Sequence, residues 1–284
     1  MTQSSEFIQK KRFIIHLGKA LHKFGTPAFR LEAHLQNVSK LLQIQGGFII
    51  SPTALTFVIA EDKDSQEYTH IARVNPGEID LGSLARTDEL VDELDSGQRT
   101  LDEAIERLED IVNRPNPYGK FLTFLAFGAS SGAFAMLMHT TWSDVIWSTL
   151  LGFIVALYVF WAERSKRVLE MLEPISALTS ALIISAVAVF DPSINVSLVI
   201  LSAIIPFIPG LAITLGLSEL AHRNLLSGTA RIMDAVMSLF KLYFGAVLGI
   251  ALGTLLWGKN EFVVTQNMPD WTSWVAVTIL SISL

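Results

Sequence analysis

The sequence predicts a polytopic α-helical membrane protein with about five spans, the start of a sixth, and an N-terminal cytoplasmic α+β domain. The 284 residues have a mean hydropathy of +0.45, and 51% of them are hydrophobic. About two thirds of the Asp, Glu, Lys and Arg residues fall before Lys120, and nearly continuous apolar sequence follows. This asymmetry divides the chain into a polar N-terminal region and a region suited to a bilayer.

The polar region begins with two predicted helices. Apolar residues recur at helical spacing over residues 13–24, and Gly25 ends the pattern. A second helix is expected up to residue 46, with Thr26 as its N-cap and Pro27 as its first helical residue. A glycine followed by a cap and a proline is typical of a tight corner between helices.

A small antiparallel sheet is expected next. Residues 48–60 and 68–74 are rich in β-branched and aromatic side chains, and the polar run 61–67 joins them as a loop. These segments complete the strand content that the sequence predicts.

Two more helices are expected at 81–94 and 100–113, the second opened by a capping box of Thr100 and Glu103. The acidic residues between 88 and 110 form either a cation site or a solvated helix face, and the apolar spacing favours the solvated face. The histidines lack metal-ligand spacing and a recognisable nucleophile, and the chain has no cysteine. We therefore expect no metal site, no cofactor and no catalytic residue.

An apolar succession follows the linker 113–119, so the predicted domains are 1–117 and 118–284. Each of five apolar segments approaches or exceeds the roughly 20 residues that cross a bilayer core of about 30 Å. A sixth segment begins at Trp271 and reaches Leu284, about 14 residues later, so a second membrane half is expected. The five segments are 121–138, 144–162, 174–190, 195–217 and 235–257.

The gaps between these segments predict the orientation. Lys and Arg gather in "AERSKRVLE" and "SELAHRNLLSGTARIMD", whereas "HTTWS" and "DPSIN" have none. By the positive-inside rule, the N-terminal domain is cytoplasmic. The first residues contain no apolar core of signal-peptide length, and basic residues are outnumbered, so a nucleic-acid partner is not expected.

The fourth apolar segment is interrupted in its middle by Pro206, Pro209 and Gly210. Each proline removes a backbone donor, so the sequence predicts two half-helices that meet here. Free backbone groups are costly in hydrocarbon, and they persist only where protein or water satisfies them. The interruption therefore points to a functional site near the membrane midplane.

Charged residues near the fourth and fifth segments are candidate coupling or gating groups. Glu219 follows the broken segment, and Arg231 and Asp234 are three residues apart, so they can pair on one helix face. Lys241 lies one turn before a stripe of glycines at every fourth position, so it faces the bundle interior or extends to the cytoplasmic surface. The stripe indicates close helix packing and consists of Gly245, Gly249 and Gly253.

These residues belong to a longer pattern, "PGLAITLGLSELAHRNLLSGTARIMDAV", which resembles the bacterial threonine/serine exporter family. "GTPAFRLEAHL" is similar to the family's N-terminal signature, and "DSGQRTLDEAIERLEDI" resembles its helix before the membrane region. The acidic position, usually Asp in the family, is Glu here. The matching residues are Gly25, Arg30, Glu32, Pro209, Gly210, Thr214, Glu219, Ser227, Gly228 and Arg231.

The resemblance implies proton-driven export of threonine and serine across the bacterial inner membrane, and a second membrane half as a fused C-terminal region or separate subunit. A homo-oligomer is another expected arrangement. Half-helix ends suit a zwitterion, since amides attract its carboxylate and carbonyls its ammonium. We expect the carboxylate at residues 210–212, the ammonium near Ile204 and Ile205, and the hydroxyl at Thr214, with Pro206 and Pro209 shaping the site.

Two other functions remain open from the sequence. The N-terminal domain could belong to a membrane-anchored enzyme such as a hydrolase, although no nucleophile, base and orienting group can be assembled. The chain could also be a non-transporting regulatory subunit, for which an uninterrupted fourth span is expected. The broken segment favours the transporter.

Overall fold

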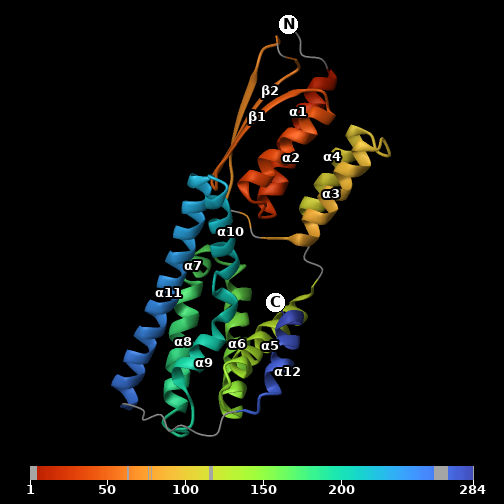
Figure 1. Cartoon of the computed structure of the whole chain (residues 1–284). Coiled ribbons are helices and arrows are strands. Elements are labelled where there is room, and N and C mark those ends of the chain that lie inside the picture. The colour runs from red at the N-terminus through yellow and green to blue at the C-terminus, as the bar shows by residue number, and fades with distance from the viewer. Residues whose placement is uncertain are drawn as a thin grey trace. The chain divides into compact units, whose positions relative to one another are not determined.

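The protein is described by a computed structural model that covers residues 5–62, 64–75, 77, 79–114, 118–258 and 268–283. The chain forms two compact units (Figure 1). The first comprises Met1–Pro115 and Leu211–Met233, and the second comprises Asn116–Gly210 and Asp234–Leu284. Residues 211–233 thus group with the N-terminal region, whereas the sequence-based domains 1–117 and 118–284, which stay a prediction, place them with the membrane helices. The predicted linker falls partly on 115–117, outside the described residues.

The first unit contains an antiparallel sheet in the order β1-β2-β3. The predicted run 48–60 is divided by a turn into β1 (Gln45–Ile50) and β2 (Ala54–Ala60), and β3 (Tyr68–Arg73) pairs with β2. The turn forms because the Ser51 hydroxyl donates to the Ala54 carbonyl and accepts from the Ala54 amide. Every second residue of β2 is fully buried, so one face of the sheet supplies the core.

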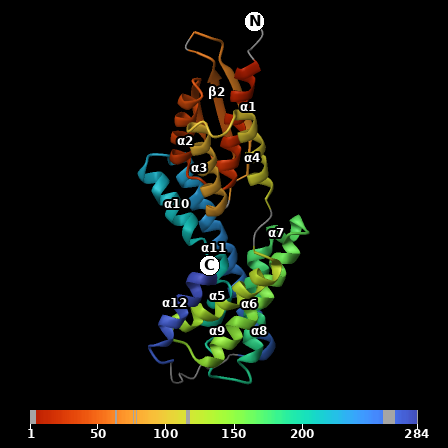
Figure 2. The ribbon, with the colours of Figure 1, turned by 90° about the vertical axis from the view of Figure 1, so that its right-hand side faces the viewer.

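Four helices complete the N-terminal region: α1 (Ser5–Lys23), α2 (Ala28–Leu41), α3 (Leu81–Asp95) and α4 (Leu101–Asn113). Figures 1 and 2 show α1 and α2 between the sheet and the α3–α4 pair. The predicted capping box of α4 is confirmed, with both Thr100 and Glu103 bonds formed. The core joins all three layers through aromatic and aliphatic side chains such as Phe13, Leu35, Phe57, Leu90 and Leu108.

The predicted start of α2 is wrong by one residue. The helix begins at Ala28 with Pro27 as its N-cap, and no side chain of its own first turn caps it. Thr26 does not act as N-cap, and its hydroxyl oxygen is buried without a hydrogen-bond partner. The group that accepts the first free amide of α2, that of Ala28, is the side chain of Glu219.

The second unit is helical, with α5 (Lys120–Leu137), α6 (Trp142–Ala162), α7 (Lys166–Glu170), α8 (Leu172–Val187), α9 (Val196–Ala203), the 3₁₀ turn η1 (Ile205–Phe207) and α12 (Thr272–Ser283). Helices α10 (Gly210–Ala221) and α11 (Leu225–Trp257) belong to both units. The Asp144 carboxylate accepts the Asn195 amide, and the Asn195 side chain caps α9. This contact fixes where α9 begins.

Among the described residues, three helices are long and apolar enough to cross a membrane: α5, α6 and α11. The pair α9 and η1–α10 makes a fourth if it is counted as one span. Helix α8, with 16 residues, and α12, with 12, are apolar but shorter. The chain is thus a helical membrane protein, and the described residues contain three or four helices of spanning length. The count of five spans stays a prediction.

The glycine stripe of α11 packs closely against another helix, as the sequence predicts, and the structure identifies that helix as α8. A Cβ atom at Gly249 would lie 2.5 Å from the Ala181 Cβ and 2.6 Å from the Leu178 carbonyl oxygen. A Cβ at Gly245 would collide with the Pro174 carbonyl. Glycine is required at these positions because the two helix backbones approach closely.

Candidate functional site

The predicted interruption of the fourth apolar segment is confirmed. Helix α9 ends at Ala203, η1 follows, and α10 begins at Gly210, with a bend of 54° between the two helical parts. Pro206 lies inside η1, where its fixed φ is tolerated but an α-helical hydrogen bond is lost. The two prolines and the glycine therefore produce the break for the reason that the sequence suggests.

The backbone groups at the break are already partly used. The Ile204 carbonyl accepts from the Phe207 amide at 2.9 Å, and the Ile205 carbonyl accepts from Ile208 at 3.1 Å. The Gly210 amide donates to the Ile208 carbonyl at 2.8 Å. Each carbonyl keeps a second lone pair for another donor, but the Gly210 amide is occupied.

The predicted substrate residues differ in their environments. Pro206 and Pro209 are half-buried, whereas Gly210 and Thr214 are exposed. A Cβ added to Gly210 would meet no atom within 4 Å. Space is thus open beside the first residue of α10.

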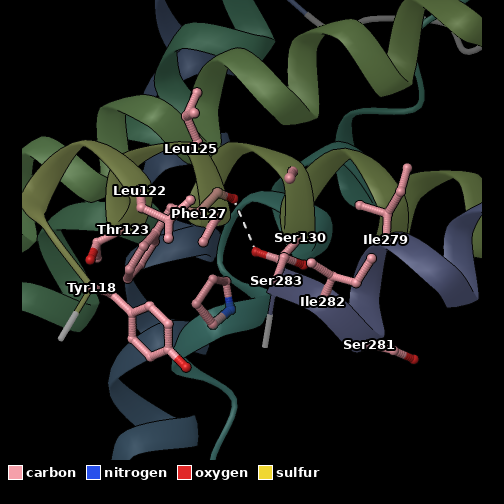
Figure 3. A pocket seen from close by; sticks show the side chains of 13 residues that line it. Tyr118, Leu122, Thr123, Leu125, Phe127, Ser130, Ile279, Ser281, Ile282 and Ser283 are labelled. Carbon is pink, nitrogen blue, oxygen red and sulfur yellow. Dashed lines mark hydrogen bonds between the residues drawn. The ribbon is translucent and has the colours of Figure 1, made fainter.

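A pocket of about 820 Å³ lies beside η1 in the second unit (Figure 3). Pro206 contributes to its wall, whereas Pro209, Gly210 and Thr214 do not. Side chains of α5 and α12 form most of the rest, and hydroxyl groups of Thr123, Ser130 and Ser281 interrupt an apolar lining. The Ser130 hydroxyl donates to the Phe127 carbonyl at 3.0 Å, the dashed line in Figure 3.

Sequence reasoning did not find this pocket. The only local signal is a pair of polar residues, Ser130 and Ser131, inside an otherwise apolar segment. Serine is common in membrane helices as a packing residue, so the pair alone does not identify a cavity.

A second polar cluster lies within the first unit and centres on Glu219. Its side chain is fully buried, and Oε1 accepts the Ala28 backbone amide at 3.0 Å. The Oε2 atom lies 3.5 Å from the Arg231 Nε atom. Among the described residues, the ion-pair partner of Arg231 is therefore Glu219 rather than the expected Asp234, which is exposed.

Close packing of α10 and α11 places Glu219 near Arg231. A Cβ at Gly228 would lie 2.9 Å from the Gly216 carbonyl oxygen, and a Cβ at Gly216 would lie 2.7 Å from the Ile232 side chain. Larger residues at these two positions would separate the helices. The Gly228 of the exporter-like pattern thus has a structural function.

The N-terminal pattern reaches the same cluster. Gly25 has φ of 77° and ends α1, with its amide donating to the His22 carbonyl and the Thr26 amide to the Leu21 carbonyl. This Schellman turn directs the chain into α2. Phe29 stacks on His222 of α10 with ring centroids 4.0 Å apart.

Two residues of the N-terminal pattern lie outside the cluster. The Arg30 guanidinium lies 5.8 Å from the Phe29 ring centroid and is exposed. Glu32 accepts a bond from Gln36 on the same helix. The structure thus brings Gly25 and Glu219 into one neighbourhood, but not Arg30 or Glu32 with them.

His22 is a buried member of the cluster that the sequence did not single out. Burial lowers its pKa, a backbone hydrogen bond with Ser51 opposes this shift, and nearby Arg231 adds to it. Its Nδ1 atom is buried without a hydrogen-bond partner. The imidazole is therefore neutral at pH 7.

Lys241 lies in the second unit, apart from the Glu219 cluster. Its ammonium is 3.7 Å from Glu173 at the start of α8, and the Lys241 side chain is 38% exposed. Among the described residues, no group of three His, Asp or Glu side chains could hold a metal ion.

Apart from Arg30 and Glu32, the matching residues lie at the break or around Glu219. A family described as "Putative threonine/serine exporter" (ThrE) matches residues 12–253. The chain belongs to this family. The ThrE match extends from α1 to α11 and so includes both units.

Fungal membrane proteins are among the curated relatives of this ThrE chain. It is 27% identical over 255 residues to "Pheromone-regulated membrane protein 10" of Pichia sorbitophila, covering 87% of this chain and 25% of the relative. It is 26% identical over 254 residues to "Uncharacterized protein C7D4.12c" of Schizosaccharomyces pombe, covering 87% of this chain and 33% of that protein. The chain thus spans a quarter to a third of these relatives. No solved structure matches it.

Proposed function

We propose that this chain is part of an exporter of threonine and serine, with the substrate bound at the break between α9 and α10. ThrE membership over residues 12–253 carries this proposal. The observed interruption at Pro206–Gly210 supports the position of the site. A broken helix leaves backbone amides and carbonyls without helical partners, and these groups can bind a polar ligand inside the membrane.

The substrate zwitterion is oriented by the two helix ends. Its carboxylate lies at the first turn of α10, at Leu211 and Ala212, because the Gly210 amide is occupied by Ile208. Its ammonium uses the remaining lone pairs of the Ile204 and Ile205 carbonyls. The substrate hydroxyl bonds to Thr214.

The transport cycle uses a proton gradient, with Glu219, Arg231, Asp234 and Lys241 as the coupling or gating groups. The N-terminal region lies in the cytoplasm and the helices lie in the bacterial inner membrane, following the positive-inside pattern of the gaps. Five spans then require α8 to cross a membrane that is thin around it, since 16 residues span only about 24 Å. Helix α12 is the beginning of the sixth span. A second membrane half completes the transporter.

Non-enzymatic function is supported by the ThrE match, but a regulatory subunit is the alternative to a transporting one. The chain, supplied with its second half, is reconstituted in liposomes and tested with labelled threonine and labelled lysine. Threonine transport that responds to an imposed pH gradient, with little lysine transport, is expected. Absence of both threonine and serine transport by the complete assembly would contradict the proposal.

A further inference from the structure

The first turn of α2 has an unusual cap. Helix N-termini leave backbone amides unpaired, and a side chain at the N-cap commonly accepts one of them. Pro27 occupies that position and has no side-chain acceptor. The carboxylate that caps the turn is that of Glu219, which is 191 residues away in sequence and lies on α10.

The two carboxylate oxygens of Glu219 are held unequally. Oε1 makes a 3.0 Å hydrogen bond, whereas Oε2 is held only by the 3.5 Å ion pair with Arg231 and has no hydrogen bond. Near it, the Arg231 Nε and His22 Nδ1 atoms are also buried without hydrogen-bond partners, as is Thr26 Oγ1 at the corner before α2. A buried polar atom without a hydrogen bond lowers the stability of the contact, because it loses the bonds that it would make to water if α10 moved away from α2.

The charges around Glu219 come from every element packed on it. Arg231 of α11 lies 3.5 Å from its carboxylate, and the Ala28 amide of α2 donates to it. His22 of α1 is neutral, and His222 of α10 is stacked on Phe29. The attraction is therefore strong and local, while the unpaired polar atoms lower its net stability. A contact of this kind can close and open.

We propose that Glu219 is a releasable latch that fastens α10 to the corner between α1 and α2. Helix α10 is continuous from Gly210 to Ala221, so a movement at Glu219 is transmitted over nine residues, about 14 Å, to the break. The contact itself does not depend on the transport assignment, but the role of the latch in controlling the half-helix rests on the proposed function. Arg231 positions the latch.

Ala28→Pro removes the donor of this bond, and its ring also adds two carbon atoms at a buried position. Ala28 is the first residue of α2, where proline is well tolerated, and Pro27 already has the extended ψ of 144° that a following proline requires. Trp142→Pro is the matched control, because Trp142 is the exposed first residue of α6 and Thr141 before it has an extended ψ of 164°. The Thr141 side chain binds the Asp144 amide there. Glu219→Gln removes the charge at the other end of the latch while keeping its volume.

Hydrogen exchange of residues 211–221 is measured on the full chain in lipid nanodiscs, with threonine transport measured in parallel on the complete assembly. Ala28→Pro and Glu219→Gln each speed the exchange about tenfold, the double variant matches the faster single variant, and Trp142→Pro leaves it unchanged. Both latch variants also lose transport rate. If Ala28→Pro does not fold, the hydrogen exchange of Glu219→Gln alone tests the latch.

Unchanged exchange in both latch variants, or additive effects in the double variant, would overturn the latch. Faster exchange without any change in transport would retain the contact and remove its control over the half-helix. An inactive wild-type assembly with faster exchange in the variants would leave the latch intact and reject the proposed transport function.

Discussion

Helix α11 is held by two different kinds of contact along its length. In the first unit, Arg231 pairs with a buried carboxylate that also caps another helix. In the second unit, Gly245, Gly249 and Gly253 allow the backbone of α8 to approach directly. Water can replace either partner of a polar contact through new hydrogen bonds, whereas nothing in the bilayer replaces the close contact between two helix backbones. The difference predicts that α11 is fixed along its glycine stripe and adjustable near Arg231.

The largest effect is expected from Gly249→Leu. Even a Cβ at this position would contact the Leu178 backbone oxygen at 2.6 Å, so the helices must separate. We expect a loss of about 3 kcal/mol in stability, measured by thermal unfolding in detergent. The control is Gly119→Leu, since a Cβ there meets nothing within 4 Å and a loss no greater than about 1 kcal/mol is expected. Equal losses in the two variants would contradict a tightly packed contact between the glycine stripe and α8.

The same two contacts show how much the sequence can predict. The glycine stripe and the break at Pro206 were predictable, because periodicity and proline chemistry are local properties. The cap of α2 was not, since Pro27 suggests a self-contained helix start and nothing local indicates an acceptor in residue 219. The pocket at Ser130 also depends on a distant helix, α12. The order of helices and strands was largely predicted, but the turn at Ser51 within the first strand run was not.

A smaller effect is expected from the pH dependence of stability, through His22 beside the Glu219 contact. Burial lowers the pKa of His22 below its ordinary value near 6.5, so the unfolded chain binds a proton at higher pH than the folded chain. Stability is therefore lost as the pH falls from about 6.5 toward the folded pKa, and it is fully present above that window. His16, His34 and His70 also have lowered pKa values and contribute to the same trend.

His22→Gln isolates the contribution of this residue. The variant keeps a polar side chain that cannot be protonated, so its melting temperature should fall less than that of the wild type between pH 7.5 and 5.5. His16→Gln is the comparison at a more exposed position, and it is expected to weaken the pH dependence less than His22→Gln does. A wild-type pH dependence in His22→Gln would show that His22 is not buried as a neutral group.

The smallest effect is expected at Lys241, beside the glycine stripe. Its ion pair with Glu173 is 3.7 Å long and 38% of its side chain is exposed, so water screens the attraction. A double-mutant cycle with Lys241→Met and Glu173→Gln should give a coupling energy of about 0.5 kcal/mol. A coupling above about 2 kcal/mol would mean that Lys241 is a buried interior charge.

The most direct test of the central claim, that substrate binds at the break, is threonine transport by Gly210→Leu. The position is exposed and a Cβ there meets no atom within 4 Å, so the variant should fold. A leucine side chain would nevertheless fill the space beside the first turn of α10, where the substrate carboxylate is expected. In liposomes containing the complete assembly, the account predicts that Gly210→Leu abolishes threonine transport while Gly119→Leu retains it. Undiminished transport by Gly210→Leu would contradict a substrate site at this break.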